Sequence, residues 1–323
     1  MSNAPAMHYN DKDDARHPFE GDKYYEWWYF DAQFDNGYSC VITFHYRLVF
    51  MEPHFPALQM HIYAPDGKGY VGFKSYDAQL VSASPDHCDV KMGESHVRQE
   101  NGVYKVLART RKAGAELTFR NILPGWKPDG TGSLYDKGGI WQGWVVPVPR
   151  GEVEGTLYFG DQAVKVKGNR GYHDHNWGNA AMHDVFSGWY WGRLYDDKYT
   201  VIYGWVYPMK AGDPMSAKLY VARENKPILA TRNFVLKEKD VQEDPDLKRS
   251  YARSLELTSK EKDVDFSCTM NTKNVVEKLD MSGPANWPTY YFRFLADYDA
   301  RIAAGSRKEE VKGETIHEYM LFK

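Results

Sequence analysis

The sequence predicts an all-β protein built from two related halves. Aromatic residues are abundant, with 10 Trp, 24 Tyr and 15 Phe in 323 residues, and aromatic side chains favour strands. Short apolar runs alternate with Gly, Pro and Asp-Gly punctuation at the spacing of about 8–12 residues that is typical of barrels and sandwiches. A 20-residue segment also recurs at a spacing of 161 residues, half the length of the chain.

The Gly, Pro and Asp-Gly positions that separate the apolar runs predict the strands of the first half. Residues 1–22 are polar and are expected to form a flexible arm before the fold. The first strand is Glu26–Phe34, and Asn36-Gly37 supplies the positive φ values of a tight turn before the return strand Tyr38–Phe50. The further strands expected in this half are Leu58–Tyr63, Tyr70–Ser75, Val103–Arg111, Ala115–Asn121, Gly143–Val148 and Glu152–Phe159.

The repeat indicates an internal duplication. Aligned without gaps, Trp27–Tyr46 and Gly188–Tyr207 share five identities, and the two hairpin turns coincide. This alignment places Trp28-Tyr29 on Trp189-Tyr190. The domains are therefore expected at residues 23–180 and 181–323.

The strands of the second half match this division. They are expected at Ser187–Tyr195, Lys198–Tyr207, Lys218–Arg223, Ser254–Thr258, Asp263–Met270, Tyr290–Asp297 and Thr315–Leu321. The charged segment Lys237–Arg249 is expected to be an exposed loop.

Composition excludes several classes of function. The net charge of -3 gives no reason to expect nucleic acid or an anionic membrane as a partner. No stretch approaches the ~20 apolar residues of a membrane span.

Cys40, Cys88 and Cys268 are odd in number and far apart, which favours a reducing compartment. With no signal peptide recognisable at the N-terminus, a cytoplasmic location is expected; nothing in the sequence specifies an oligomeric state.

The densest polar cluster is the central motif, Gly171-Tyr172-His173-Asp174-His175-Asn176-Trp177-Gly178. If this segment is extended, alternate residues share a face. Tyr172, Asp174 and Asn176 then face one way, and His173, His175 and Trp177 face the other. So many polar groups are costly in a core unless they have hydrogen-bond partners. Such a cost is often tolerated at a functional site.

Three interpretations of the central motif compete. His173 and His175 could chelate a metal, with His183 or Asp184 as a third ligand, but nothing in the spacing places that ligand. The motif could instead be a structural polar network joining the halves. The third interpretation is an acid–base site, in which Asp174 loses solvation among aromatic rings, so that its pKa rises and it can deliver a proton. A neighbouring His would hold or relay that proton.

A second carboxylate, Glu26, opens the first aromatic strand and shares a face with Trp28 and Phe30. It is expected to be solvent-exposed at the strand end, with the wall of a cavity as the alternative. The motifs of serine hydrolases, P-loop proteins and dinucleotide-binding proteins are absent from the sequence. No cofactor and no metal are therefore expected.

With these residues in view, the chain resembles the AttH / carotenoid 1,2-hydratase-like proteins, also called the hydroxyneurosporene synthase family. The resemblance rests on Glu26–Phe30, on the central motif and, more weakly, on Gly313…Glu318-Tyr319. It implies two lipocalin-like β domains packed side by side, with an apolar pocket for a small molecule in or between them. Members of the family include enzymes that hydrate a terminal prenyl double bond and others that steer Diels–Alder cyclisation.

The leading hypothesis is an enzyme that hydrates or cyclises a hydrophobic alkene, such as a prenyl or polyene compound, without a cofactor. Asp174 would protonate the double bond with help from His175, and Glu26 is a further catalytic candidate. Two alternatives remain: a pericyclase that only folds its substrate, and a carrier of an apolar ligand. The residues expected to contact the substrate are Trp28, Tyr29, Tyr172, His173, Asn176, Trp177, Trp189 and Tyr190.

Overall fold

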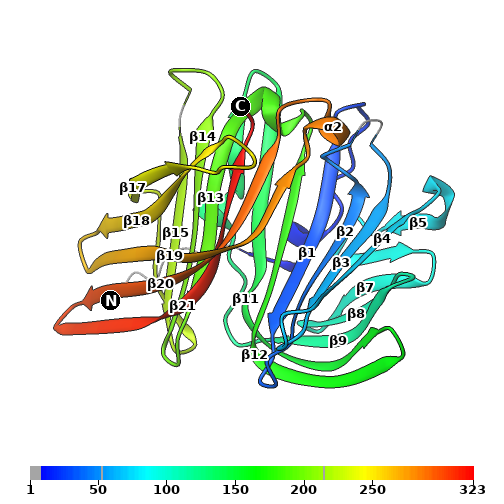
Figure 1. The fold of residues 1–323 in the computed structure, drawn as a ribbon, viewed down its shortest axis with the longest axis horizontal. Helices are drawn as coiled ribbons and strands as arrows, with labels where there is room; N and C mark the ends of the chain where they lie inside the picture. The colour runs from blue at the N-terminus through cyan, green and yellow to red at the C-terminus, as the bar shows by residue number, and fades with distance from the viewer. Residues whose placement is uncertain (1–8, 52–53, 214) are drawn as a thin grey trace. The chain divides into compact units, whose positions relative to one another are not determined.

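The strands of this chain gather into two antiparallel sheets (Figure 1). The computed structural model describes residues 9–51, 54–213 and 215–323. Contacts divide the chain into two compact units, of which the first ends at Ala181 and the second begins at Met182. Within the described residues no helix is long and apolar enough to cross a membrane.

The first unit holds a sheet with the strand order β4-β3-β2-β1-β12-β11-β9-β8-β7-β6-β5, with β10 paired to β11. Its first strand, β1, therefore pairs with its last, β12, as the blue and green ribbons of Figure 1 show. The strands are β1 (Tyr25–Gln33), β2 (Ser39–Arg47), β3 (Ala57–Tyr63), β4 (Gly69–Ser75), β5 (Val81–Ala83), β6 (Asp89–Met92), β7 (Ser95–Glu100), β8 (Val103–Arg109), β9 (Ala113–Asn121), β10 (Ser133–Lys137), β11 (Ile140–Phe159) and β12 (Gln162–Gly178). Short 3₁₀ helices are η1 (Asp11–Asp14), η2 (Ala78–Leu80) and η3 (Pro128–Gly130).

The second unit holds a sheet with the order β16-β15-β14-β13-β21-β20-β19-β18-β17. Its first strand again pairs with its last, so the two units follow the same scheme with different numbers of strands. The strands are β13 (Phe186–Tyr195), β14 (Tyr199–Pro208), β15 (Ser216–Arg223), β16 (Lys226–Thr231), β17 (Val235–Glu243), β18 (Ser250–Lys260), β19 (Val264–Asp280), β20 (Tyr290–Ala304) and β21 (Arg307–Leu321). The short helices are α1 (Met182–Val185) and α2 (Ser282–Ala285). The prediction of an all-β duplicated fold is confirmed.

The ungapped alignment of the repeat is wrong by one residue in the first strand. Trp28 pairs with Phe44 in the first unit, and Tyr190 pairs with Trp205, the counterpart of Phe44, in the second. Trp28 is therefore equivalent to Tyr190, not to Trp189. The turn between β13 and β14 is shorter than that between β1 and β2, and a one-residue change reverses the face of every side chain.

Each sheet curls around its own apolar core. The first core contains Trp28, Phe30 and Phe119, and the second contains Tyr190, Phe292 and Phe294. All of these aromatic side chains are buried. Hydrophobic burial of this kind is the main stabilising term in a β protein.

Two segments differ from expectation. Within the expected N-terminal arm, residues 9–22 are described, and η1 packs against the first unit with Ala15 buried. The charged segment Lys237–Arg249, expected to be a loop, continues β17 as far as Glu243. Its side chains are mostly exposed, because β17 is the edge strand of its sheet, and charge protects an edge from further pairing.

Candidate functional site

The central motif forms the end of β12, and its side chains alternate as predicted. Tyr172 and Asn176 both hydrogen-bond the Asp174 carboxylate on one face. His173 and His175 both contact Asp14 on the other face. Adjacent strand residues point to opposite sides of a sheet. The structure therefore separates Asp174 from His175, which corrects the prediction that the two act together on one proton.

Asp174 lies on the face of β12 opposite the core, and only 6% of the residue is exposed. Its Oδ2 accepts hydrogen bonds from Trp144 Nε1 at 3.1 Å and from the Tyr172 hydroxyl at 2.9 Å. Its Oδ1 accepts one from Asn176 Nδ2 at 2.9 Å. Trp144 comes from β11, so two neighbouring strands hold this carboxyl group in place.

Burial raises the pKa of Asp174 to about 6, although the hydrogen bonds from Tyr172 and Trp144 lower it in part. This agrees with the prediction of a carboxyl group whose pKa rises among aromatic rings. Because Oδ2 already accepts from two donors, the proton of the neutral form belongs on Oδ1. Asn176 can then turn its amide so that its oxygen accepts that proton.

On the core face, His175 lies between two buried carboxylates. Its Nδ1 lies 3.3 Å from Asp14 Oδ1, as an ion pair without good hydrogen-bond alignment, and its Nε2 lies 3.0 Å from Glu26 Oε1. A neutral imidazole has one N–H and could serve only one of these oxygens. The imidazolium form, with an N–H group on each ring nitrogen, is the one that matches both carboxylates.

The pKa values in this network follow from its charges. Burial alone would lower the pKa of His175, but the neighbouring carboxylates of Asp14 and Glu26 raise it to about 8. Burial alone would raise the pKa of Glu26, but hydrogen bonds from His17 and His175 lower it to about 2. Burial alone would also raise the pKa of Asp14, but the charge of His173 lowers this pKa well below its usual range. Asp14, Glu26 and His175 are thus ionised at neutral pH, and the His175 imidazolium lies between the two carboxylates.

The expectation that Glu26 is solvent-exposed is wrong, because the residue is fully buried. Its carboxylate accepts hydrogen bonds from the His17 backbone N–H at 2.8 Å and from the Tyr24 hydroxyl. The His17 ring also stacks on Trp177, with 3.7 Å between ring centroids. Residues of the expected arm therefore cover the strand end and exclude water from Glu26.

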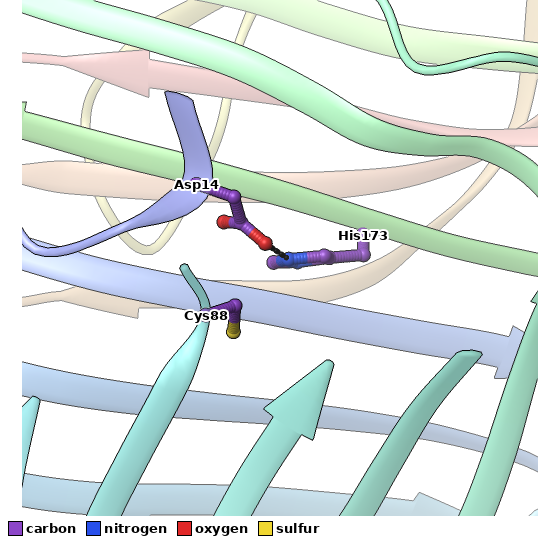
Figure 2. A group of neighbouring side chains, drawn as sticks. All are labelled: Asp14, Cys88 and His173. Carbon is purple, nitrogen blue, oxygen red and sulfur yellow. Dashed lines mark hydrogen bonds and ion pairs between the residues drawn. The ribbon is translucent and has the colours of Figure 1, made fainter. Parts of the chain in front are cut away.

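Sequence reasoning missed Asp14, which Figure 2 shows pointing at His173. Asp14 Oδ2 lies 3.0 Å from His173 Nε2 and accepts a hydrogen bond from the Tyr104 hydroxyl at 2.8 Å. Its position in a polar N-terminal segment gave no sign of burial. The only available signal was the unusual density of histidine on β12, which called for a buried acid from elsewhere in the chain.

Among the residues that the structure describes, two groups of side chains have the donor types that bind metals. They are Asp14, Cys88 and His173, drawn in Figure 2, and His17, Glu26 and His175; within each group the ligand atoms lie within 4.8 Å of one another. Burial and the charge of Asp14 raise the pKa of Cys88 well above its usual range, which favours its thiol form. The hydrogen bonds and ion pairs described above already account for the carboxylates, and the arrangement is a charged polar network.

The remaining predicted site residues fall into two sets. In the first unit, Trp28 is fully buried and stacks on His175 with 4.3 Å between centroids. The Tyr29 backbone oxygen lies 2.9 Å from His173 Nδ1, and the Tyr29 ring lies 6.3 Å from Tyr172. Trp189 and Tyr190 belong to the second unit, where Trp189 contacts Phe322 and Tyr190 stacks on Tyr319.

The second unit carries a carboxyl group at the position equivalent to Asp174. Asp174 pairs with Tyr29 in the register of β1 and β12. The corresponding pair in the second unit is Trp191 and Glu318. Glu318 forms an ion pair with Arg293, with 2.9 Å between Arg293 Nη2 and Glu318 Oε1. Asp174 has indole, phenol and amide donors in place of an arginine, and this difference distinguishes the two units chemically.

Comparison with solved structures identifies proteins of the same architecture. An AttH protein of Nitrosomonas europaea matches with a TM-score of 0.67 and 14% identity over 100% of this chain and 99% of its own. CghA, solved with Sch210972, matches with a TM-score of 0.68 and 13% identity over 93% of this chain and 89% of its own. The chain has the AttH-like fold. A kievitone hydratase of Nectria haematococca also has it, with a TM-score of 0.61, 13% identity and the same two coverages.

Sequence comparison agrees with this AttH-like fold. A hydroxyneurosporene dehydrogenase of Chlorobaculum tepidum is 28% identical over 231 residues, which cover 58% of each chain. The chain therefore spans little more than half the length of that relative. No protein-family model matches the sequence. The resemblance to AttH / carotenoid 1,2-hydratase-like proteins, predicted from the aromatic and central motifs, is confirmed.

Proposed function

We propose that this protein is an enzyme that protonates a carbon–carbon double bond of a hydrophobic small molecule, such as a prenyl or polyene compound. The observation that carries the proposal is the state of Asp174. Its carboxyl group is nearly buried, its pKa lies at about 6, and three neutral donors hold it in position. A carboxylic acid whose pKa lies this close to neutral pH is a suitable general acid.

The contrast with Glu318 supports the assignment. Glu318 is paired with the positive charge of Arg293, whose Nη2 lies 2.9 Å from Glu318 Oε1. At the equivalent position, the three hydrogen bonds to Asp174 come from neutral groups. The network around His175 is a poorer candidate for the acid, because its two carboxylates are ionised and an imidazolium of pKa about 8 is a weak donor toward an alkene.

The proposed step begins with transfer of the Asp174 Oδ1 proton to one alkene carbon. The π electrons form the new C–H bond, the other carbon becomes a carbocation, and Asp174 becomes a carboxylate. Water then attacks the cation and loses a proton to Asp174, which gives net hydration. Attack by an internal alkene or hydroxyl group, followed by proton loss, gives cyclisation instead.

Aromatic rings on the same face can stabilise the cation. Tyr172 and Trp144 hydrogen-bond the acid directly, and Tyr29 lies beside Tyr172. A cation over an aromatic face is stabilised by about 0.5–2 kcal/mol per ring. Trp28, His173 and His175 are fully buried on the core face, so in this proposal they support β12 and do not contact the substrate.

Similarity to named proteins supports the same class of reaction. One structural neighbour is a kievitone hydratase, and the sequence relative is named for hydroxyneurosporene. CghA was solved with the compound Sch210972, so a second neighbour binds a small molecule. Fold alone does not select a reaction, so the proposal depends on Asp174.

The experiment is incubation with neurosporene and lycopene in D₂O, followed by mass spectrometry of the extracted product. Hydration adds the mass of one water and places one non-exchangeable deuterium on carbon. Acid-initiated cyclisation leaves the mass unchanged apart from deuterium. A pericyclic reaction rearranges its substrate without deuterium, and a carrier returns its ligand unaltered. Rearrangement without deuterium, or no reaction with any alkene of a wider prenyl panel, would contradict the proposal.

A further inference from the structure

A cavity of about 410 Å³ opens in the first unit beside Tyr24. Its volume is at the lower end of the range for small-molecule sites, about 300–1,000 Å³. Its walls come from residues 16–24, from the end of β2 and from the segments before β3 and β5. None of the side chains that hydrogen-bond Asp174 lines it, so the cavity is separate from the proposed acid.

The walls of the cavity combine apolar surface with a guanidinium group. Phe19, Tyr46, Pro56 and Val81 supply apolar surface. The Arg16 guanidinium stacks over Tyr46, with 4.3 Å from its carbon to the ring centroid. This stacking covers one face of the guanidinium group and fixes its plane.

Arg16 also has an unused donor. Its Nε is buried and has no hydrogen-bond partner among the described residues. The second arginine of the cavity, Arg47, already donates from Nη1 to the Gly21 carbonyl oxygen at 2.8 Å. A buried donor without an acceptor is destabilising, and a guanidinium edge matches the two oxygens of a carboxylate.

We propose that this cavity binds a small monocarboxylate with an apolar body, the carboxylate meeting the Arg16 guanidinium group. Glu20 and Asp22 also line the cavity, and both are exposed at its rim. They repel a dianion such as a phosphate monoester more strongly than a single carboxylate. A neutral or cationic ligand would leave Arg16 Nε without an acceptor.

The occupant would also touch the polar network. Tyr24 lines the cavity, and its hydroxyl lies within hydrogen-bond distance of the Glu26 carboxylate and of the His17 carbonyl oxygen. A ligand in the cavity would therefore hold the Tyr24 ring against its hydrogen-bond partners. This binding site does not depend on the proposed reaction at Asp174.

The experiment is titration calorimetry of the full chain with decanoate, geranate and decanol. We expect one molecule of carboxylate to bind per chain and decanol to bind at least tenfold more weakly. A preference for geranate or for decanoate identifies a prenyl or a straight body, and both outcomes support a carboxylate site. Equal binding of decanol, or no binding of either carboxylate, would overturn it.

Variants test the role of Arg16. R16Q removes the charge at similar length and should weaken carboxylate binding at least tenfold, whereas R16K, which keeps the charge without the planar edge, should fall between R16Q and the wild type. R120Q removes an exposed arginine that pairs with Glu154 and should bind as the wild type does. V81W fills the cavity with Arg16 intact and should also abolish binding. Unchanged binding by R16Q or V81W would refute the site.

Discussion

Replacing Asp174 with asparagine distinguishes an acid from a structural carboxyl group. Trp144 and Tyr172 donate to Oδ2, and the amide oxygen of asparagine can accept both of these hydrogen bonds. The new NH₂ group would then face Asn176, which accommodates it by turning its own amide. D174N therefore removes the transferable proton and retains the local hydrogen bonds.

The magnitude of the effect on stability follows from the pKa. Burial raises the pKa of Asp174 from 3.8 to about 6, and each unit corresponds to about 1.4 kcal/mol. Because the folded pKa is the higher one, its contribution to stability is fully present below pH 4 and is lost as the pH rises through 6. Above pH 6 the wild type bears a cost of about 3 kcal/mol that D174N does not.

The assay combines urea unfolding at pH 4 and pH 8 with the deuterium experiment. D174N should be more stable than the wild type at pH 8, by up to about 3 kcal/mol, and should not incorporate deuterium. D31N is the matched control, because the charge of Asp31 raises the pKa of Asp174. It keeps the acid and should shift the rate profile toward lower pH. Turnover by D174N, or its loss of stability at pH 8, would refute the reasoning.

The core network and its packing give three further predictions. H175Q removes the cation between Asp14 and Glu26 and should cost about 3–5 kcal/mol by urea unfolding at pH 6.5; a cost below 1 kcal/mol would contradict the ion-pair assignment. The wild type should lose about 2 kcal/mol between pH 6.5 and pH 9, because the pKa of His175 is raised from 6.5 to about 8, and H175Q should lack that loss. G143A should lose about 1–3 kcal/mol in thermal unfolding, since a Cβ there overlaps the Trp177 ring, and an unchanged melting temperature would contradict this packing.

The architecture was largely predictable from the sequence because its signals are local. Asn36-Gly37 marks the turn that follows β1, and the alternation of β12 correctly assigned each side chain of the central motif to a face. The repeat correctly predicted the shared scheme of strand pairing. It failed by one residue in β1, because an ungapped comparison cannot detect a turn of different length.

The candidate site was less predictable because it is assembled from distant residues. Asp14 and His173 are 159 positions apart, and nothing local in a polar segment indicates that an aspartate is buried. Glu26 is at the start of its strand, where exposure is the usual outcome, but His17 and Tyr24 cover it. The faces of β12 could be predicted, whereas the partners on those faces could not.

The pairing of β1 with β12 has a consequence for the biosynthesis of the protein. Asp14 and Glu26 leave the ribosome early, and the histidines that pair with them follow about 150 residues later, after roughly 8–30 s of translation at ~5–20 residues per second. During that interval neither carboxylate can be buried without leaving an unpaired charge. A nascent chain that stops short of Gly171 therefore keeps its N-terminal segment in water, and the arrival of β12 is the event that both neutralises the core and completes the site.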